Sequence, residues 1–561
     1  MLSFRRPIPS GSEYERRLAD ELSLIQRFGF ENVFTQVREI LDLAEDIPHI
    51  TRGSAGSSLV CYLMGITDFD PIQHQFCLAR FMHERRQDLP DIDIDFPYNR
   101  RDEVIERVKK KYPGRVARIS TKIRYRRDSA IRQALREHGH HCFLPRGFDL
   151  AKIAGAAAES ILKRAEELEG QVRLNALHCG GIIIFDGPVP DDLKIKDDHI
   201  KLDKDDVESA GLHKIDLLCN RGLAQWTELA SRPLPDYPEE DDDTSRLFIE
   251  GDTWGVTFAE SPAQRKLCGA LNVRRRSDVV AALALIRPVP SADGRKLDAL
   301  ETWRKTGTLQ GHLIYDEDGI LLIQTLLGCS ESEAEYYRRG FAKEDEVRIK
   351  EFSQRIRHVP DWPKMVKELS YYSLYSFCKA HATAYGYLVW ALAYEKTRQR
   401  HKFWLAALNH AASMYEPWVH VQEAKYEGLK FANFGPPGHW QLENDLLTNL
   451  KPDKVQGDGW QQFHKRHYWI SNRFMPDCYF DGQRFRGLIA TGRHHTVGGR
   501  EITFITIGYK TGHYVNLVCE ELVNFGGWDL VEGTCRPQGD SYKVVQMHGW
   551  KLLPAKMRLT P

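Results

Sequence analysis

The stretch Pro90-Asp91-Ile92-Asp93-Ile94-Asp95-Phe96 alternates carboxylate and apolar side chains. Because successive side chains of a strand point to opposite faces, the alternation predicts a strand with its three aspartates on one face and its two isoleucines in the core. Carboxylates this close repel one another, and a hard divalent cation such as Mg2+ would offset that repulsion. The alternative is a solvated edge strand whose acids prevent aggregation.

The length and amino-acid composition of the chain indicate a globular protein of several domains. It has 561 residues, of which 42% are hydrophobic and 28% charged, and its formal net charge is zero. Any nucleic-acid site must therefore be a local basic patch. The 11 cysteines form no CxxC motif, which argues against a structural zinc and a disulfide framework. We expect no signal peptide and no membrane span, and reduced cysteines in a cytoplasmic protein.

Two features precede the acidic strand. Residues 51–58, TRGSAGSS, lie ahead of the apolar run LVCYLMGI. Small residues that open a helix leave backbone N–H groups for an anion, although an ordinary loop and N-cap has the same composition. Arg80, Arg85 and Arg86 could face triphosphate oxygens, or they could pair with neighbouring acids on the surface.

A strongly basic segment, residues 100–136, follows the acidic strand and includes Tyr112 and Tyr125. Such a segment is typical either of a solvated helix face or of a nucleic-acid contact. The residues predicted to bind DNA in this segment are Lys122, Arg124, Arg126 and Arg127.

A second short strand is predicted at residues 211–218, GLHKIDLL, with Asp216 as the acid inside it. A carboxylate in an apolar strand needs a partner, either a cation or the nearby Lys214. Upstream, residues 178–185 (HCGGIIIF) predict a tight turn into a buried strand. Adjacent residues of a strand point apart, so His178 and Cys179 are not expected to form a catalytic pair.

Elsewhere the pattern predicts helix over residues 13–46 and 150–170, and mostly helix from the acidic stretch 235–245 to about residue 432. We interpret residues 235–245, DYPEEDDDTSR, as a linker between domains. From residue 485, five short strands with glycine turns predict a small barrel such as an OB-fold.

Taken together, the motifs resemble the bacterial C-family replicative polymerases, the family of the DNA polymerase III alpha subunit. The motifs occur in the family's order: RGS with GITDFDP, PDIDIDF with RRDEVIE, HCGG, GLHKIDLL, F-x-ES, RPVP, YRRGFAK and YSFCKAHATAY. The resemblance covers residues 12 to 430 and resumes weakly in the C-terminal barrel. It implies an α/β multidomain protein with a polymerase-beta-like palm, a helical thumb and helical fingers, followed by an all-β OB-like barrel.

The resemblance also implies roles for single residues. Asp91, Asp93 and Asp216 would hold two Mg2+ ions, with Mn2+ as an alternative, and Lys214 matches a catalytic lysine of the family. Asp95 matches the pattern but is not a family ligand. The residues implied to bind the nucleotide are Arg52, Gly53, Ser54, Arg80, Arg86, Arg338, Arg339, Lys379 and His381.

The chain also departs from the family. No PHP domain, helix-hairpin-helix repeats, clamp-binding peptide or exonuclease motifs are recognisable. A family lysine is replaced by Asp128, next to Arg126 and Arg127. The expectation is a polymerase core of low processivity without proofreading. The implied domains are palm 1–120, thumb 121–172, palm 173–234, fingers 235–432, a linker region 433–483 and a barrel 484–561.

Three functions are therefore weighed. The first is a template-directed DNA polymerase that adds deoxynucleotides to a primer 3′ end, with primer-template DNA and deoxynucleoside triphosphates as partners and single-stranded DNA as a candidate ligand of the barrel. The second is a catalytically inactive scaffold that binds primed or single-stranded DNA. The third is a template-independent nucleotidyltransferase. A sliding clamp is left open as a partner.

Overall fold

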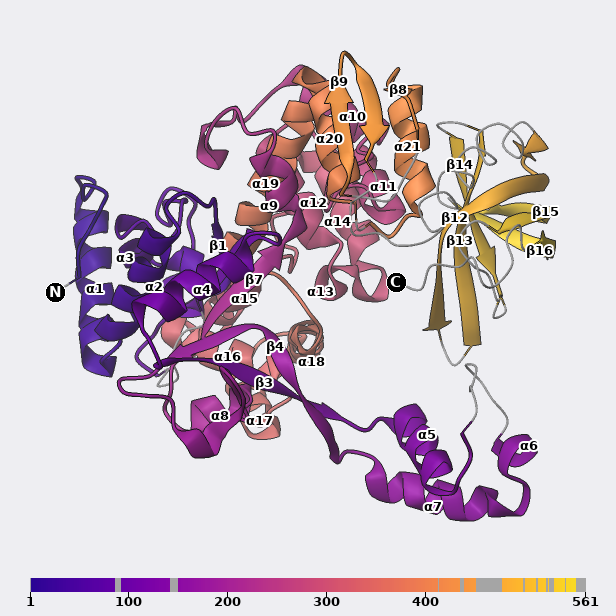
Figure 1. The fold of residues 1–561 in the computed structure, drawn as a ribbon. Coiled ribbons are helices and arrows are strands. Elements are labelled where there is room, and N and C mark those ends of the chain that lie inside the picture. Colours follow the sequence, from indigo (N-terminus) through magenta and orange to yellow (C-terminus); the bar gives the residue numbers. More distant parts are fainter. Residues whose placement is uncertain are drawn as a thin grey trace. The chain divides into compact units, whose positions relative to one another are not determined.

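The computed structural model describes residues 2–85, 92–141, 150–411, 413–433, 438–450, 477–497, 500–510, 513–520, 523, 529–539 and 541–550. The chain divides into two compact units, Met1–Cys219 and Asn220–Pro561. Figure 1 shows the elements of both units along the chain. None of the helices in the described residues is long and apolar enough to cross a membrane.

The first unit is built on a seven-stranded sheet with the order β1-β2-β7-β4-β3-β6-β5. Its strands are β1 (Ile50–Arg52), β2 (Asp93–Pro97), β3 (Val116–Arg124), β4 (Val172–Ile184), β5 (Lys194–Lys196), β6 (His199–Ile200) and β7 (Ile215–Asn220). Its helices are α1 (Ser12–Phe28), α2 (Glu31–Leu43), α3 (Leu59–Leu63), α4 (Arg101–Lys111), α5 (Arg127–Glu137), α6 (Leu150–Ala154), α7 (Ala158–Leu168) and α8 (Lys204–Ser209).

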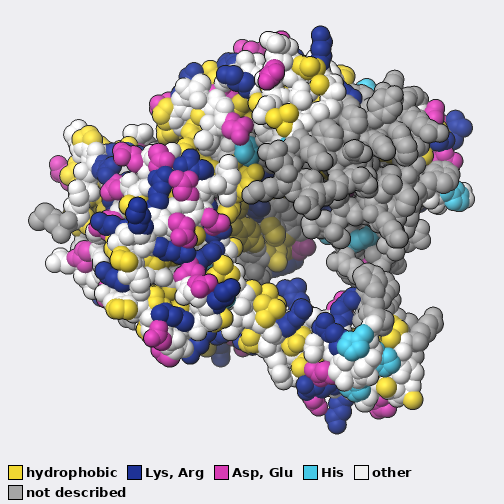
Figure 2. All heavy atoms as spheres, in the orientation of Figure 1, with side chains coloured by type: hydrophobic (Ala, Val, Ile, Leu, Met, Phe, Trp, Pro, Cys, Tyr) yellow, Lys and Arg dark blue, Asp and Glu magenta, His cyan; other side chains and the backbone are white. Residues whose placement is uncertain are grey.

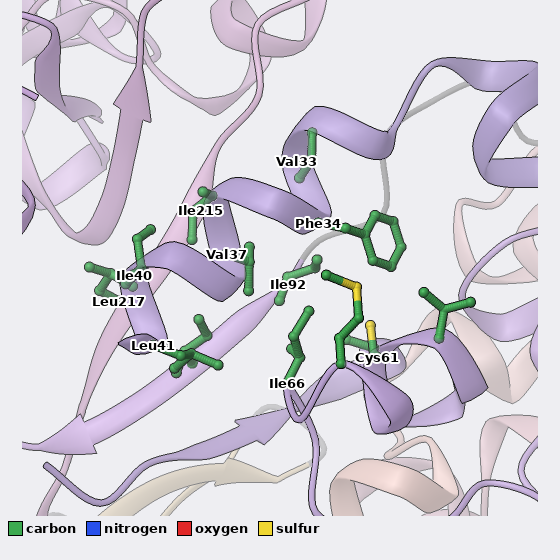
Figure 3. Close-up of a cluster of buried hydrophobic side chains, with 14 of the residues drawn as sticks. Val33, Phe34, Val37, Ile40, Leu41, Cys61, Ile66, Ile92, Ile215 and Leu217 are labelled. Carbon is green, nitrogen blue, oxygen red and sulfur yellow. The ribbon is translucent and has the colours of Figure 1, made fainter. Parts of the chain in front are cut away.

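The main core of this unit lies between the sheet and helices α1 to α4. Ile92 and Ile94 of the acidic stretch are 1% and 0% exposed, as the alternating pattern predicts. Figure 3 shows Ile92, Ile215 and Leu217 in the same apolar cluster as side chains of α2. Both acidic strands therefore use their apolar side chains to hold one face of the sheet against the helices.

The predicted helix over residues 13–46 is two helices in the structure. Helix α1 ends at Gly29, whose φ of 70° lies in the left-handed region, and α2 begins two residues later. A glycine in this conformation commonly ends a helix because it has no Cβ to clash. The periodic apolar pattern continued across the break and concealed it.

Helices α5, α6 and α7 form a lobe that is inserted between β3 and β4, which run antiparallel as a long ribbon (Figure 1). The lobe has its own small core, made by apolar side chains such as Ala130, Leu135 and Ile161. The helical expectation for residues 150–170 is confirmed by α6 and α7.

The second unit begins with a helical region. Its helices are α9 (Arg221–Thr227), α10 (Asp242–Glu250), α11 (Pro262–Leu271), α12 (Arg276–Leu285), α13 (Pro288–Ser291), α14 (Arg295–Thr306), α15 (Asp316–Leu327), α16 (Glu331–Ala342), α17 (Glu346–Arg355), α18 (Trp362–Ser370), α19 (Lys379–Arg398), α20 (Arg400–Asn409) and α21 (Pro417–Tyr426). Helix α19 is buried over most of its length. A Cβ on Gly386 would lie 2.4 Å from Val280, so this glycine permits the close approach of α12 and α19.

The acidic stretch 235–245 is not a linker. It lies inside the second unit, and the division of the chain falls before it, after Cys219. Tyr237 is 2% exposed and donates a hydrogen bond to Glu395 on α19, while Asp241 caps α10. Its acids serve as helix caps and ion-pair partners, which composition alone does not distinguish from solvated charges.

Two β structures follow the helices. The first is a three-stranded sheet of β8 (Lys430–Phe431), β10 (Leu446–Asn449) and β9 (Trp440–Glu443). The second is a closed five-stranded barrel in the order β12-β13-β14-β16-β15, because β12 also pairs with β15. Its strands are β12 (Arg484–Val497), β13 (Arg500–Lys510), β14 (His513–Cys519), β15 (Leu530–Gln538) and β16 (Ser541–Trp550), with the short β11 (Tyr479–Phe480) paired to β12. The prediction of a C-terminal barrel of five strands is confirmed.

Candidate active site

The structure places the two predicted acidic strands side by side. Strands β2 and β7 are neighbours in the sheet, and the backbone N–H of Asp216 donates to the carbonyl of Ile92 at 3.4 Å. The apolar side chains on either side of both acids enter the helix-covered core. By the alternation of a strand, Asp93 and Asp216 therefore project from the opposite face. Asp91 lies outside the described residues.

Two basic side chains offset the negative charge on this face. Arg52, at the end of β1, lies 3.2 Å from the Oδ2 of Asp93 through Nη1 and 2.9 Å from the Oδ1 of Asp95 through Nε. Lys214 forms an ion pair with Oδ2 of Asp216. The predicted pairing of Lys214 with the third acid is thus present. Arg52, predicted to bind the nucleotide, binds the acidic strand.

Asp216 keeps one oxygen available for a ligand. Its Oδ1 is buried and has no hydrogen-bond partner among the described residues, and the Nδ1 of His178 lies 3.9 Å away. A buried carboxylate oxygen without a partner is costly, and a hard cation is the partner that carboxylates favour. Within the described residues, no group of three His, Cys, Asp or Glu side chains is arranged to hold a metal ion. Of the three aspartates predicted as metal ligands, Asp93 and Asp216 lie within the described residues.

His178 has a structural task that the sequence did not reveal. Its Nδ1 accepts hydrogen bonds from the backbone N–H groups of Gly180 at 3.2 Å and Gly181 at 2.7 Å. The register between β4 and β3 shifts within this segment. On the other side of β4, Gly181 pairs with Asp216 of β7. Burial lowers the pKa of His178, which favours the neutral ring that can accept these bonds. The imidazole therefore shapes the strand opposite Asp216.

Gly180 and Gly181 of the HCGG motif are both required by close packing. A Cβ on Gly180 would lie 2.6 Å from the carbonyl oxygen of Leu217, and a Cβ on Gly181 would lie 2.8 Å from Ile119. Any larger residue at either position would push β4 away from its neighbours. The HCGG motif thus acts through backbone fit rather than through the thiol of Cys179.

Gly53 lies directly beside the acidic face. Its φ of 75° is in the left-handed region, and a Cβ there would lie 3.4 Å from Asp93 Oδ2. Ser54 follows it in the 3-10 turn Gly53–Ser57 and is half-buried. The chain therefore brings the predicted Gly-Ser loop to the acidic face, as a nucleotide-binding loop requires.

Of the two interpretations of this segment, the ordinary N-cap is the one found at the start of α3 (Leu59–Leu63). The buried carboxylate of Glu21 accepts hydrogen bonds from the N–H of Leu59 at 2.8 Å and of Val60 at 3.0 Å, and Ser58 Oγ caps Cys61. The anion at the start of α3 is thus a side chain of the protein itself, from α1. Glu21 gave no local signal because its partners are far away in the chain.

The remaining predicted nucleotide contacts of the first unit are two arginines. Arg80 ends a short 3-10 helix, Leu78–Arg80, and is half-buried. Arg86 lies outside the described residues.

In the second unit, Arg338 is used inside the protein. It is 5% exposed, binds Glu335 through Nε at 2.6 Å and Nη2 at 2.9 Å, and lies 3.5 Å from Asp316. Such a bidentate pair holds the guanidinium in place. Its neighbour Arg339 is half-buried on the same helix, α16.

The other two predicted contacts of this unit open helix α19. The backbone N–H of Lys379 donates to Glu317 at 2.9 Å, and its side chain is half-buried. His381 is buried and stacks on Phe377 with a ring distance of 4.2 Å.

The predicted DNA-binding residues lie at the junction between the ribbon and the lobe. Lys122 is ion-paired with Asp206 at 2.6 Å and Asp203 at 3.2 Å. Arg124, Arg126 and Arg127 are exposed. Figure 2 shows Lys and Arg side chains (dark blue) and histidines (cyan) gathered on this lobe. A local basic surface is thus present on a chain whose formal net charge is zero.

Two family models match the chain. Residues 3–144 match the bacterial DNA polymerase III alpha NTPase domain, and residues 227–359 match the bacterial DNA polymerase III alpha subunit finger domain.

Curated relatives agree with these matches. The DNA polymerase III subunit alpha of Halalkalibacterium halodurans is 29% identical over 74% of this chain and 43% of its own length. That of Thermotoga maritima is 27% identical over 76% of this chain and 51% of its own length. A protein of Dechloromonas aromatica named error-prone DNA polymerase is 28% identical over 76% of this chain and 48% of its own length. The chain spans about half the length of these relatives. Together, the two domain matches and these relatives support a bacterial C-family DNA polymerase, the family of the DNA polymerase III alpha subunit.

Proposed function

We propose that the chain is a template-directed DNA polymerase of DNA replication or repair, which adds deoxynucleotides to a primer 3′ end by two-metal-ion nucleotidyl transfer. One observation carries the proposal: Asp93 and Asp216, from distant segments, share one face of the sheet, and a carboxylate oxygen of Asp216 is buried there with no hydrogen-bond partner in the part of the chain that the structure describes. Relatives named as polymerases support the reaction class.

The donor set fits a hard divalent cation. Asp93 and Asp216, together with Asp91, would hold Mg2+, or Mn2+ in its place. When bound, such a pair of ions supplies activation of the primer 3′-hydroxyl and stabilisation of the leaving pyrophosphate. Lys214 holds Oδ2 of Asp216, which leaves Oδ1 for a ligand. Arg52 holds Asp93 and Asp95 on the same face through the guanidinium.

The nucleotide and DNA contacts are proposed from the remaining residues. Gly53 and Ser54 would contact the triphosphate from the loop beside Asp93. Arg80 and Arg339 would add positive charge, with Lys379 and His381 contacting the nucleotide from α19. We leave Arg338 out of these contacts because its guanidinium is bound to Glu335.

Two further parts would engage DNA. The exposed arginines of the ribbon and lobe would contact the phosphates of primer-template DNA. The closed barrel, which we propose to be OB-fold-like, would bind single-stranded DNA on its strands. The reaction would take place in the cytoplasm of a bacterial or phage-infected cell.

Primer extension tests the proposal. With Mg2+ and a primed template, the wild type should incorporate nucleotides, whereas Asp216→Asn and Asp93→Asn should lose at least about 100-fold in rate while still binding primed DNA. Asp191→Asn is the matched control, because Asp191 is a highly exposed acid of the same unit paired with Lys194. Extension of a single strand without template would instead identify a template-independent transferase, and DNA binding without any incorporation would identify a scaffold.

A second measurement is independent of turnover. Titration with Mn2+, followed by electron paramagnetic resonance, should show binding to the wild type that Asp216→Asn weakens. Unchanged Mn2+ binding and wild-type extension by both aspartate variants would refute the site.

A further inference from the structure

A row of aromatic rings crosses the helical region of the second unit. Phe258 stacks on Tyr385 at 4.9 Å with 13° between the ring planes, and Tyr385 meets the edge of His381 at 4.8 Å. His381 stacks on Phe377, which meets Tyr375 at 5.7 Å. Of the three rings between the ends, His381 and Phe377 are buried and Tyr385 is half-buried. Phe258 and Tyr375, at the two ends, are 38% and 57% exposed.

Phe258 is presented by a strained backbone. Its φ is 72°, a left-handed conformation that a phenylalanine rarely adopts. Glycine or asparagine would adopt this conformation at less cost, so packing alone does not explain why an aromatic residue occupies the position. A strained, exposed ring is more readily explained by an interaction that the ring makes with a ligand.

The neighbouring residues hold the strained turn in place. Thr257 Oγ1 donates to Gln225 at 2.7 Å, and the carbonyl of Ala259 accepts from Thr253 Oγ1 at 2.8 Å. Both Thr257 and Ala259 are buried. The turn is therefore anchored on both sides of Phe258, and the ring is held in position before any ligand arrives.

The α9 helix leaves room for the ring. A Cβ on Gly222 would lie 3.2 Å from Cε2 of Phe258 and 3.1 Å from Thr257. Gly222 thus allows the edge of the ring to rest against the helix while one face stacks on Tyr385.

The charges beside the row suit a nucleic acid. The guanidinium of Arg287 lies 4.0 Å from the centre of the Phe377 ring, and Lys379 begins the same helix that carries His381 and Tyr385. A flat aromatic face with cationic groups nearby is the arrangement that binds bases by stacking and the backbone by charge.

We propose that the ring of Phe258 is a stacking platform for a nucleobase. This inference rests on the proposed polymerase function and adds a contact to it. The base belongs either to the template strand or to the incoming nucleotide, and both present the same flat aromatic face.

Three variants test the ring. Phe258→Asn suits the left-handed backbone but has no ring, Phe258→Leu keeps apolar bulk without a flat face, and Phe258→Trp keeps the face. Tyr426→Asn is the control, because Tyr426 is a 66% exposed aromatic residue on α21 of the same unit. The Asn and Leu variants should weaken either primed-DNA affinity or the KM for nucleotide by about 5- to 100-fold, the loss typical of one stacked base. The Trp variant and the control should stay within about twofold of the wild type.

Fluorescence of 2-aminopurine identifies the strand. The probe is placed at the template position opposite the incoming nucleotide, or supplied as its deoxynucleoside triphosphate. Quenching that depends on Phe258 in the first arrangement assigns the platform to the template, and in the second to the nucleotide. Quenching in neither arrangement would overturn the proposal.

Thermal unfolding separates stacking from packing. Phe258→Asn should melt at or above the wild-type temperature because it relieves backbone strain. A fall of several degrees with unchanged affinities would show that the ring only packs the protein surface, and would overturn the proposal. If the wild type binds primed DNA but extends no primer, the proposed polymerase function is refuted. Primer extension reports that outcome, separately from the affinities and melting temperatures of the Phe258 variants.

Discussion

At the scale of single residues, the two oxygens of Asp216 have different environments. Oδ2 is held by Lys214, while Oδ1 is buried without a hydrogen-bond partner among the described residues. One carboxylate can therefore be both oriented by the protein and open to a cation. The need of Asp216 for a partner was predictable, because the apolar strand around it and Lys214 two residues away are visible in the sequence.

Gly53 offers a test at this scale. Gly53→Ala should destabilise the protein by about 1 kcal/mol, because alanine is disfavoured at a positive φ, and should also slow primer extension because its Cβ would touch Asp93. Extension rates and melting temperatures measure the two effects.

Gly29→Ala is the matched control for this change. Gly29 has a φ of 70°, and a Cβ there would have nothing within 4 Å. It should lower the melting temperature to a similar extent and leave extension unchanged. Equal activity losses in the two variants would show that strain, and not contact with Asp93, slows the enzyme.

At the scale of elements, α21 and β14 are joined by a buried carboxyl group. Glu423 is 2% exposed and accepts a hydrogen bond from the hydroxyl of Tyr514 at 2.7 Å. Burial raises the pKa of Glu423 from 4.5 to about 6, and the nearby Asp252 raises it further. The hydrogen bond from Tyr514 and the charges of Lys396 and Arg265 oppose this rise.

The sign of the resulting pH dependence follows from linkage. Between pH 4.5 and about 6 the folded protein binds more protons at Glu423 than the unfolded chain, so its contribution to stability decreases as pH rises through this window. The full effect is roughly 2 kcal/mol. Glu423→Gln should remove it and flatten melting temperature against pH between 4.5 and 6 relative to the wild type.

The exposed Glu250 of α10 supplies the control. Glu250→Gln should leave the wild-type pH profile unchanged. A Glu423→Gln profile parallel to that of the wild type would show that this carboxyl does not titrate with folding.

Element boundaries also show what periodicity can and cannot reveal. The number of barrel strands was predicted correctly because apolar stretches alternate with turn residues, although β12 runs on to Val497. The break at Gly29 and the cap at Asp241 were missed although both are local: Gly29 adopts a left-handed φ directly after α1, and Asp241 accepts a hydrogen bond from the N–H of Thr244, three residues on.

At the scale of the whole molecule, the charges balance. The chain has 78 basic Lys and Arg residues and 78 acidic residues, so DNA affinity must come from local surfaces. The exposed Arg126 and Arg127, at the start of α5, are the proposed phosphate contacts of the lobe.

Charge reversal tests this surface. Arg126→Glu with Arg127→Glu should weaken binding of primed DNA and reduce the slope of log affinity against log salt by about 2, since each phosphate contact contributes roughly 0.9. Reversal of the exposed Arg304 and Lys305 on α14 is the matched control and should preserve the slope. An unchanged slope in the Arg126/Arg127 variant would assign those residues to a solvated helix cap.

The sequence by itself determined the local features of this protein: the acidic strand, its isoleucine core, the lysine beside Asp216 and the five strands of the barrel. These depend on side-chain alternation and on neighbours within a few residues, which can be read directly from the chain. Only the tertiary structure decided that β2 and β7 lie next to each other, that Glu21 occupies the start of α3, that Arg338 is bound by Glu335, and that His178 shapes the strand opposite Asp216. Three of these contacts join segments that are far apart in sequence: β2 with β7, Glu21 with the start of α3, and the β4 segment at His178 with Asp216. Such segments meet only through the order of strands and the packing of helices. For Arg338 the partner is near, but burial of the pair decides its role.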